Sequence, residues 1–489
     1  MSPPDTACEL AEAIRAGRVS ALDATRACLE RIAALDGTLH CFLHVCAERA
    51  TARAKQVDHA VASGKNPGRL AGVPVAIKDN IAVKGVTTTC GSKMLSDFRS
   101  MYDAHVIERL ERNGAVIVGK TNLDEFSMGS SSENSAFGPT HNPWDPSRVP
   151  GGSSGGSAGA VAAGMVPVAL GTDTGGSIRQ PASYCGVVGV KPTYGRVSRH
   201  GLVSYGSSLD QIGTITRNVR DAALLLEVIA GHDVRDATCD LREVPAYVDD
   251  ISGDVCSLKI GVCRELLGDG LDAQVRGAIQ KAISRFTDAG ATVVAVTLPH
   301  ARYATACYYL VATAEASSNL ARFTGVHYGH RATQSKSIEE LYENARGRNL
   351  GAEVKRRILL GTFALSSGYY DQFYRKASKV RRLITQDFDR AFEKADVILT
   401  PVAPTTAFPI GEKVNDPLSM YLSDVYTIPA NLAGVCAASI PCGFDKSGLP
   451  IGLQITAPAF AEQTLLTAAN AFEQRTDFHR RTPSLDHAA

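Results

Sequence analysis

Two short segments rich in glycine and serine have the residue types of a site that attacks carbonyl groups. They are GGSSGGS at 151–157 and DTGGS at 173–177, and an apolar run separates them. Ser177 follows two glycines and precedes a segment that can begin a helix, because Pro181 is tolerated in a first helical turn. The N–H groups of such a turn can bind the oxyanion of a tetrahedral intermediate. We therefore predict that Ser177 is a nucleophile.

A serine nucleophile needs a base, and Lys78 is the candidate. It ends the apolar segment VPVAIK at 73–78, where burial would favour the neutral amine that accepts a proton. Ser153 in the first cluster could carry the proton between Ser177 and Lys78. The same pattern is equally compatible with a lysine that extends to solvent and with serines that only cap helices. The residues alone leave both interpretations open.

Two further motif matches lack the structural context that each motif requires. GAVIVGKT at 114–121 fits the phosphate-binding pattern G-x-x-x-x-G-K-T, but its four central residues are apolar and predict a buried strand. We expect that strand to end in a turn, with Thr121 capping a helix over 122–126. GGSSG at 151–155 fits the G-x-S-x-G nucleophile elbow, but turn-forming residues precede it instead of a strand. No histidine pair has metal-ligand spacing on a helix, so we predict no metal site.

The composition indicates a protein of the cell interior without a strong charge. Lys and Arg total 51 against 50 Asp and Glu, a net charge of +1, so no overall field would attract nucleic acid or an anionic membrane. The twelve cysteines include no Cys-x-x-Cys, and several lie in apolar segments, which is typical of buried thiols in a reducing compartment. No signal-peptide core and no apolar run near 18 residues occurs. We predict a soluble, cytoplasmic protein.

Alternating helix and strand patterns predict an α/β protein with a mixed, largely internal sheet. Capping residues Thr6 and Ser20 begin two amphipathic helices. The expected strands and helices then alternate: strands at 72–80, 115–119, 187–192, 258–263, 291–298, 396–404, 437–443 and 450–458, and helices at 106–114, 219–231, 273–290 and 462–475. Residues 303–395 are mainly helical and more charged. We expect this helical region to pack beside the sheet.

Longer segments resemble the amidase signature family. They are AIKDNI at 76–81, GGSSGGSAGAVAAG at 151–164 and GTDTGGSIRQPASYCGVVGVKPTYGRVSRHGLV at 171–203. TTTCGSKML, GKTNLDEFSMGSSSEN, EVKRRILLGTFALSS and MYLSDVYTIPANLAG are similar to one branch of it, the A subunits of tRNA-dependent amidotransferases. The similarity runs from the first helix to TDFHRRTP at 476–483. It implies one amidase domain over 1–489 with helices on both faces of the sheet, a signature core at 60–240 and a helical substrate-side region at 303–395.

The resemblance also implies roles for individual residues. In this family the nucleophile, the bridging serine after a cis peptide bond and the lysine form a Ser-cisSer-Lys triad. At the matching positions these are Ser177, Ser153 and Lys78, and the backbone N–H groups around Thr174, Gly175, Gly176 and Ser177 would bind the oxyanion.

Two charged residues match the family's glutamine-binding positions. Arg357 in EVKRRI would bind the α-carboxylate, and Asp424 in MYLSDVYT would bind the α-amino group. A zwitterion needs opposite charges at its two ends, and a planar guanidinium suits a carboxylate. Without the resemblance, an ordinary salt bridge would be the default interpretation of either residue.

The resemblance implies a glutaminase that works within a complex. Ser177 would form an acyl-enzyme with glutamine and release ammonia, which a partner subunit would use to amidate Glu-tRNA(Gln), Asp-tRNA(Asn) or both. Partner subunits B and C would complete a heterotrimer, and the complex would use ATP and Mg²⁺ through the partner. We therefore expect no cofactor in this chain and tRNA contacts mainly elsewhere. The alternatives are a stand-alone amidase and a non-catalytic member of a complex; the intact triad argues against the second.

Overall fold

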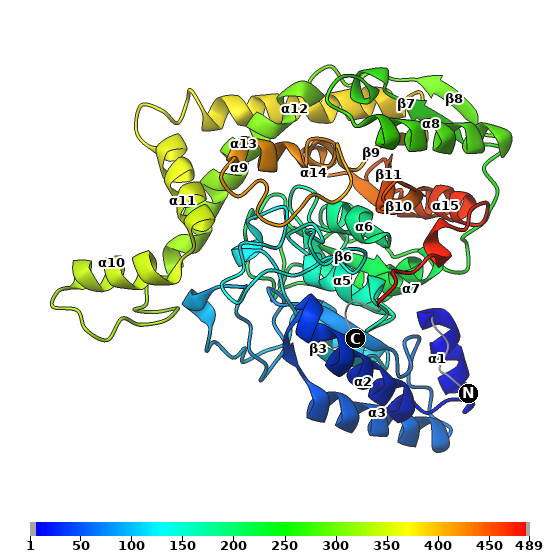
Figure 1. The fold of residues 1–489 in the computed structure, drawn as a ribbon, viewed down its shortest axis with the longest axis horizontal. Helices are drawn as coiled ribbons and strands as arrows, with labels where there is room; N and C mark the ends of the chain where they lie inside the picture. The colour runs from blue at the N-terminus through cyan, green and yellow to red at the C-terminus, as the bar shows by residue number, and fades with distance from the viewer. Residues whose placement is uncertain (1–5, 486–489) are drawn as a thin grey trace.

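The computed structural model describes residues 6–485, in which one mixed sheet of eleven strands forms the centre of the molecule (Figure 1). The strands lie side by side in the order β1-β3-β2-β4-β6-β5-β10-β11-β9-β7-β8. They are β1 (Phe42–Val45), β2 (Pro74–Lys78), β3 (Val116–Thr121), β4 (Val168–Asp173), β5 (Val188–Lys191), β6 (Gln211–Thr216), β7 (Lys259–Val262), β8 (Thr292–Ala295), β9 (Val397–Pro401), β10 (Cys436–Phe444) and β11 (Pro450–Ala457).

Fifteen α-helices surround this sheet within the same residues. They are α1 (Ala7–Arg15), α2 (Ala21–Leu39), α3 (Ala47–Ala62), α4 (His105–Arg112), α5 (Gly155–Ala162), α6 (Arg179–Cys185), α7 (Val219–Ile229), α8 (Ala273–Asp288), α9 (Ala304–Asn319), α10 (Ile338–Asn349), α11 (Ala352–Leu365), α12 (Tyr374–Phe392), α13 (Pro417–Leu422), α14 (Ile428–Ala433) and α15 (Glu462–Glu473). Short 3₁₀ turns lie between them, among them Glu125–Ser127.

The sheet has two parallel groups of strands with an antiparallel middle, and its edge strand β1 pairs antiparallel with β3. Strand β2 runs parallel to β3 and β4, and β7 runs parallel to β8 and β9. Strands β6, β5, β10 and β11 lie between these groups and pair antiparallel with their neighbours. The predicted mixed sheet is therefore confirmed.

Helices cover both faces of the sheet, and alternate side chains of each strand contact different helices. In β2, Val75 and Ile77 belong to the hydrophobic cluster with α4, α7, α8 and α15, whereas Ala76 belongs to the cluster with α2, α3, α5 and α6. Successive side chains of a strand point to opposite faces, so a strand buried on both sides must be apolar throughout. This explains the continuous apolar segment before Lys78.

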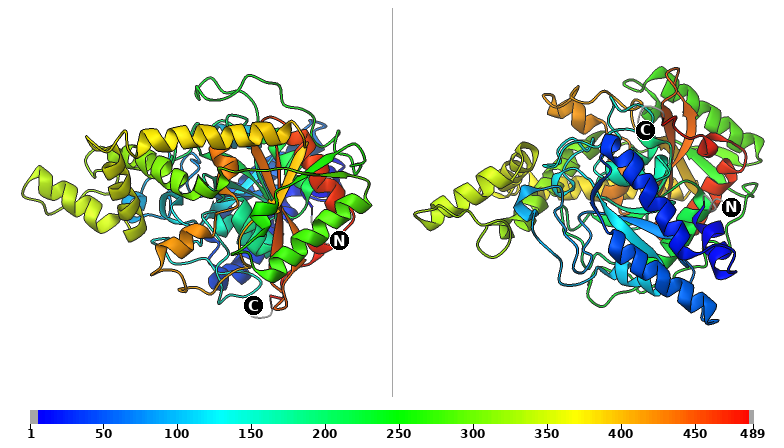
Figure 2. Two further views of the ribbon diagram at one scale, coloured as in Figure 1. Left: turned by 90° about the horizontal axis from the view of Figure 1, so that it is seen from above. Right: turned by 60° about the horizontal axis from the view of Figure 1, so that its bottom comes forward.

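The expected helical region consists of α9 to α12: α12 ends beside β7, whereas α10 and α11 lie at the opposite side of the molecule (Figures 1 and 2). Helix α10 projects away from the body of the molecule in these views. Helix α11 packs closely on α9 at Gly361, where an added Cβ would lie 1.9 Å from the carbonyl oxygen of Thr313. The absence of a side chain there sets the distance between the two helices.

Local predictions near the chain start are confirmed, and one further along is wrong. The hydroxyls of Thr6 and Ser20 accept backbone N–H groups at the starts of α1 and α2. Thr121 caps no helix: it ends β3, and its hydroxyl pairs with that of Ser157 at 2.7 Å. Residues 122–126 do not form the expected helix, since a 3₁₀ turn over Glu125–Ser127 is the only helical element near them. Among the described residues, no helix combines the length and apolar character needed to span a bilayer.

Candidate active site

Lys78 ends strand β2 and is completely buried. Its Nζ donates hydrogen bonds to three hydroxyl groups: Ser153 Oγ at 2.7 Å, Ser154 Oγ at 2.9 Å and Thr172 Oγ1 at 2.8 Å. Thr172 lies on β4, the strand next to β2, so sheet pairing brings these groups together. The lysine does not extend to solvent, so the interpretation of Lys78 as a solvent-exposed side chain is wrong.

The protonation of Lys78 follows from this burial. Loss of solvation lowers the pKa of the ammonium to about 7, although the negative charges of Asp124, Asp173 and Asp210 act in the opposite direction. A substantial fraction of the side chain is therefore a neutral amine near pH 7. A neutral amine at 2.7 Å from Ser153 Oγ can accept that hydroxyl's proton.

Ser153 lies in the turn that leads into α5, and its side chain is fully buried. The Gly152–Ser153 peptide bond is cis. The N–H of Gly152 donates to Gln180 Oε1 at 2.9 Å, and the carbonyl of Ser153 accepts the N–H of Asp124 at 3.3 Å. Neighbouring segments therefore hold this turn on both sides of the cis bond.

Ser177 lies between β4 and α6, and 8% of its surface is exposed. Its carbonyl accepts the N–H of Ser154 at 3.1 Å, so the two glycine- and serine-rich segments are in direct contact. Within residues 6–485 its hydroxyl makes no hydrogen bond. Among the three proposed triad residues, Ser177 alone retains exposed surface.

In the turn before Ser177, one of the four backbone N–H groups predicted to bind the oxyanion is not available. The N–H of Gly176 donates to Asp173 Oδ1 at 2.8 Å, so it is already paired. The N–H groups of Thr174, Gly175 and Ser177 have no partner in the described part of the chain. The Gly176 N–H therefore shapes the turn, and three of the four donors predicted for an oxyanion are without a partner within residues 6–485.

Asp173 fixes this turn from inside the protein. Its carboxylate accepts the N–H groups of Gly176 and Ile178 and pairs with the buried guanidinium of Arg179, with Nε–Oδ2 at 3.0 Å. Burial raises the pKa of Asp173, but the charge and hydrogen bonds of Arg179 outweigh it and bring the pKa to about 2. The carboxylate is therefore ionised at any physiological pH.

Arg357 lies on the inner face of α11 and is 2% exposed. Its Nε donates to Glu353 Oε1 and its Nη1 to the hydroxyl of Tyr205, both at 2.8 Å. The guanidinium carbon lies 5.2 Å from the ring centre of Tyr309 and 5.4 Å from that of Tyr421. Its Nη2 makes no hydrogen bond within residues 6–485. The guanidinium is thus held by aromatic rings with donors left for a carboxylate.

Asp424 lies between α13 and α14 and contacts the turn of the nucleophile. A Cβ built on Gly176 would come within 3.3 Å of Asp424 Oδ1 and within 2.2 Å of Thr427 Oγ1. Gly176 has φ +139°, so both its conformation and its surroundings require glycine. The structure therefore brings Asp424 against the turn that precedes Ser177, although 247 positions separate the two residues in the sequence.

One oxygen of Asp424 is available for a ligand. Oδ2 accepts the hydroxyl of Ser130, while Oδ1 is buried without a hydrogen-bond partner among the described residues. Burial raises the pKa of this carboxyl to about 7; the Ser130 hydrogen bond and the charge of Arg357 oppose the rise, and Asp173 adds to it. A bound ammonium group would pair with Oδ1 and favour the ionised form.

Sequence reasoning missed the residues that hold Arg357. Glu353 precedes it by four positions, and this helical ion-pair spacing could have been recognised. The Glu353 carboxylate also accepts the hydroxyl of Tyr421 at 2.8 Å, which connects α11 to α13. Tyr205 and Tyr309 carry no local signal, because their positions depend on how distant segments pack.

The lysine of the phosphate-motif match has a structural role. Lys120 is fully buried in β3, and its Nζ lies 2.8 Å from Asp79 Oδ1. Its Nζ also donates to the hydroxyl of Thr88 at 3.0 Å. This lysine has no open loop around it that could wrap a phosphate, in agreement with the strand expected there.

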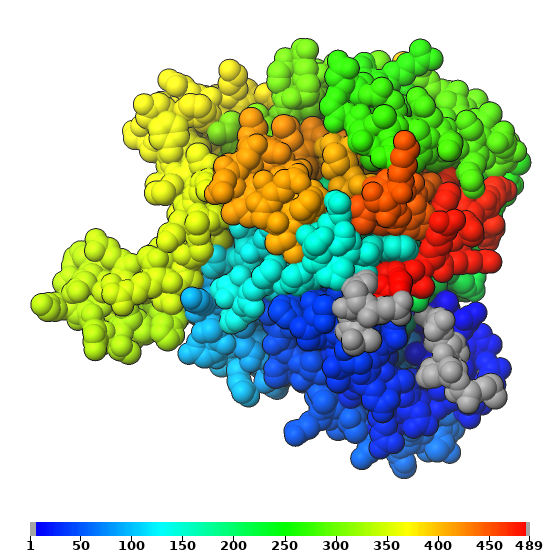
Figure 3. All heavy atoms as spheres, viewed as in Figure 1, coloured from blue at the N-terminus to red at the C-terminus, as the bar shows by residue number. Residues whose placement is uncertain are grey.

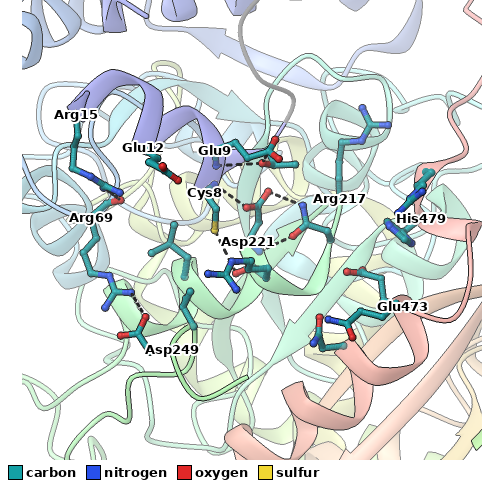
Figure 4. Close-up of a pocket in the computed structure, with 18 of the residues that line it drawn as sticks. Cys8, Glu9, Glu12, Arg15, Arg69, Arg217, Asp221, Asp249, Glu473 and His479 are labelled. Carbon is teal, nitrogen blue, oxygen red and sulfur yellow. Dashed lines mark hydrogen bonds and ion pairs between the residues drawn. The ribbon is translucent and has the colours of Figure 1, made fainter. Parts of the chain in front are cut away.

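A polar cavity of about 910 Å³ lies away from these residues, between α1, the start of α7 and the end of α15 (Figure 4). Asp221 in this cavity accepts the N–H groups of Ala7 and Cys8, both at 2.9 Å, and so caps α1. Arg69 is paired with Asp249, with a nitrogen–oxygen distance of 3.9 Å. None of the predicted catalytic residues lines it. Residues 6–485 contain no group of His, Cys, Asp and Glu side chains suited to a metal ion.

Comparisons with known proteins show which family model and which curated proteins the chain resembles. The family model described as Amidase matches residues 23–466. The chain is 57% identical over 480 residues to the A subunit of the glutamyl-tRNA(Gln) amidotransferase of Moorella thermoacetica, covering 98% of each chain. It is also 57% identical over 466 residues to the corresponding A subunit of Gloeobacter violaceus, covering 95% of each.

Solved structures show the same similarity. The A subunit of the glutamyl-tRNA(Gln) amidotransferase of Thermotoga maritima aligns with a TM-score of 0.79 at 44% identity, over 95% of this chain and 94% of that one. The peptide amidase of Stenotrophomonas maltophilia aligns with a TM-score of 0.83 at 33% identity, over 98% of each chain.

Proposed function

The chain belongs to the amidase family, and from this membership we propose that it is the glutamine-hydrolysing subunit of a tRNA-dependent amidotransferase. Its high identity over nearly the full length to amidotransferase A subunits supports this choice within the family. The site supports it independently, because buried Asp424 lies against the turn of the nucleophile and the charge of buried Arg357 acts on that carboxyl. Glutamine has a carboxylate and an ammonium group at one end and the scissile amide at the other.

The proposed reaction begins with proton transfer along three side chains. Neutral Lys78 accepts the proton of Ser153, and Ser153 takes that of Ser177 as Ser177 Oγ bonds to the side-chain amide carbon of glutamine. The N–H groups of Thr174, Gly175 and Ser177 would stabilise the oxyanion. Ser153 then protonates the nitrogen, and ammonia leaves. Water attacks the acyl-serine by the reverse proton path and releases glutamate.

The two charged residues would select the substrate. Arg357 Nη2 is available for the α-carboxylate of glutamine, and Asp424 Oδ1 for the α-amino group. The single observation that carries the proposal is the buried Lys78 bonded to Ser153 at 2.7 Å beside the turn of Ser177. It gives the amine and the bridging hydroxyl, beside the attacking hydroxyl, that amide hydrolysis by this route needs.

The ammonia would be used by a partner. We propose that subunits B and C complete a heterotrimer, in which B activates Glu-tRNA(Gln) or Asp-tRNA(Asn) with ATP and Mg²⁺. This chain is proposed to hold neither of those cofactors. A cytoplasmic location follows from a role in aminoacyl-tRNA synthesis.

The test measures ammonia release from glutamine by the chain alone and with purified subunits B and C. Ser177→Ala should lower kcat by about 10⁴-fold or more, because the acyl-enzyme can no longer form. Ser284→Ala, an exposed serine on α8, is the matched control and should leave the rate unchanged. Full activity of Ser177→Ala would exclude this residue as the nucleophile.

The same experiment separates the proposal from a stand-alone amidase. A stand-alone enzyme would hydrolyse simple amides well without partners, and adding B and C would not change its rate. The proposed glutaminase should prefer glutamine and depend on its partners for transfer of ammonia to aminoacyl-tRNA.

A further inference from the structure

The outer face of helix α11 is apolar, and nothing in residues 6–485 covers it. Leu359, Leu360 and Phe363 lie there with 69%, 45% and 49% of their surfaces exposed. Their spacing of three and four residues places them on one side of the helix. The ring of Tyr369, itself 43% exposed, lies 4.6 Å from that of Phe363. We call these four residues the α11 patch; contiguous apolar surface of this kind marks interaction sites.

The inner face of the same helix contributes to the glutamine site. Val354, Arg357, Gly361 and Ala364 are its buried positions. A helix with its side chains is about 10 Å across, so a molecule on the α11 patch lies about one helix diameter from Arg357. In Figure 1, α11 stands at the edge of the molecule between α10 and the start of α12, and Figure 3 shows that edge open to solvent.

The segment of the chain that contains the α11 patch is basic. Residues 322–382 contain 13 Lys and Arg but 5 Asp and Glu, a net charge of +8, so the other 428 residues carry −7. Six of these basic side chains are exposed and make no hydrogen bond or ion pair within residues 6–485: Arg331, Lys336, Arg348, Lys376, Lys379 and Arg382. The near-zero total charge therefore combines one basic segment with a slightly acidic remainder.

Helix α12 carries some of these charges next to the patch. The ring of Phe373, directly before α12, lies 5.5 Å from that of Phe363. Lys376 and Lys379 follow within the first two turns of α12. The apolar centre and the cationic rim are thus parts of one surface.

The chemistry of this surface selects its occupant. Exposed leucines contribute nothing to contacts with phosphates, so an RNA would leave Leu359 and Leu360 unused. An apolar centre within a charged rim is the composition of a protein interface, and a cationic rim fits acidic side chains. We infer that the α11 patch and its basic rim dock the ammonia-accepting partner, through an apolar contact of that partner surrounded by acidic residues. The inference rests on the proposed function, which requires ammonia to pass between subunits.

The test measures the affinity of the chain for purified subunits B and C by surface plasmon resonance. The double variant Leu359→Asp, Phe363→Asp should raise Kd by about 100-fold or more, since it places two charges in an apolar contact. Leu241→Asp, at a position 79% exposed and remote in sequence from the patch, is the matched control and should bind as wild type does. Unchanged thermal unfolding of each variant shows that it is folded, as expected for exposed positions.

A charge-reversed variant tests the rim separately. Lys376→Glu with Lys379→Glu should slow association by about 10-fold or more at low salt and weaken its dependence on ionic strength. Normal binding of both double variants to B and C would overturn the inference. If they assemble normally but the complex then binds tRNA more weakly in filter binding, the surface belongs to RNA, and the inference is equally wrong.

The outcomes distinguish this inference from the proposed function. If the wild-type chain does not bind subunits B and C, the proposed function fails and the docking surface with it. If the wild-type chain binds them and the variants bind equally well, only the docking surface fails.

Discussion

Lys78 shows how a residue that is ordinarily a cation can act as a base. Its environment contains three hydroxyl oxygens within 2.9 Å, and no carboxylate forms an ion pair with it in the described part of the chain. Hydroxyl groups accept a hydrogen bond from either protonation state, so they do not hold the proton on the amine as a carboxylate would. Burial is therefore the main influence on Lys78, and it lowers the pKa of the ammonium to about 7.

The pH dependence of kcat/KM for glutamine follows from two groups of the free enzyme. Lys78 must be neutral and Asp424 must be ionised, and both have a pKa of about 7. Both active forms increase as pH rises, so kcat/KM should rise from about pH 6 to about pH 8 and then level off. In the complex with glutamine, the substrate's ammonium group keeps Asp424 ionised. The rise of kcat with pH should therefore follow the deprotonation of Lys78 alone. Steady-state rates across this range test the assignment.

The variant Lys78→Arg isolates the first of these groups. A guanidinium keeps the positive charge but stays protonated, so kcat should fall about 10³-fold or more at every pH in that range. Activity equal to wild type would rule out Lys78 as the base.

Asp424→Asn should affect binding more than chemistry. The charge-assisted hydrogen bond to the α-amino group is lost, and KM for glutamine should rise roughly 10- to 100-fold. The amide 4-carbamoylbutanoate lacks the α-amino group and serves as the control substrate. Its kcat/KM should change little, and an equal loss for both substrates would contradict the assigned role of Asp424.

Helix α11 is the element whose position the site depends on most. Gly361→Ala would place a Cβ 1.9 Å from the carbonyl oxygen of Thr313 and push α11 away from α9. Overpacking of this kind costs about 1–3 kcal/mol. Because Arg357 lies one turn away, KM for glutamine should rise together with the fall in thermal stability.

The matched control is Gly347→Ala in α10, where a Cβ would meet nothing within 4 Å. It should stabilise the helix by up to ~1 kcal/mol and leave KM unchanged. Thermal unfolding and glutamine kinetics of both variants measure the difference. Similar effects of the two changes would mean that α11 does not depend on close packing at Gly361.

Sequence patterns predicted elements where local chemistry determines them. The capping hydroxyls of Thr6 and Ser20 act over three residues, and the apolar segment before Lys78 requires burial on both faces. The helix expected at 122–126 was wrong because the Asp124 carboxylate accepts the N–H of Ser132, which bends that segment into a loop. The hydrogen bond from the Gly176 N–H to Asp173 could not be predicted either, because it depends on how the turn folds.

At the scale of the whole molecule, the cysteines act as small apolar side chains. All twelve are free thiols, and Cys256 alone is exposed among them. A thiol reagent should therefore modify Cys256 first in the native protein, and unfolding should expose the others. Alkylated Cys256 should leave glutaminase activity unchanged, because this residue contacts none of the proposed catalytic groups. Rapid reaction of most thiols in the native state would contradict the burial.

Charge is distributed over the molecule in a way that composition could not reveal. A net charge of +1 predicted no overall field, yet residues 322–382 alone carry a net charge of +8. The arrangement of the central sheet was also beyond sequence reasoning, because the pairing of distant strands has no local signal. Recognising the order of helices and strands was enough for the fold class but not for the neighbours of each strand.

The position of β10 in the middle of the sheet has a consequence for synthesis of the chain on the ribosome. Strand β5 is complete at Lys191, but its second neighbour begins at Cys436. Until about 245 further residues have been made, β5 presents an unpaired, apolar edge on one side. Such an edge can pair with other nascent chains. Premature termination before residue 436 should therefore yield fragments that depend on chaperones or aggregate.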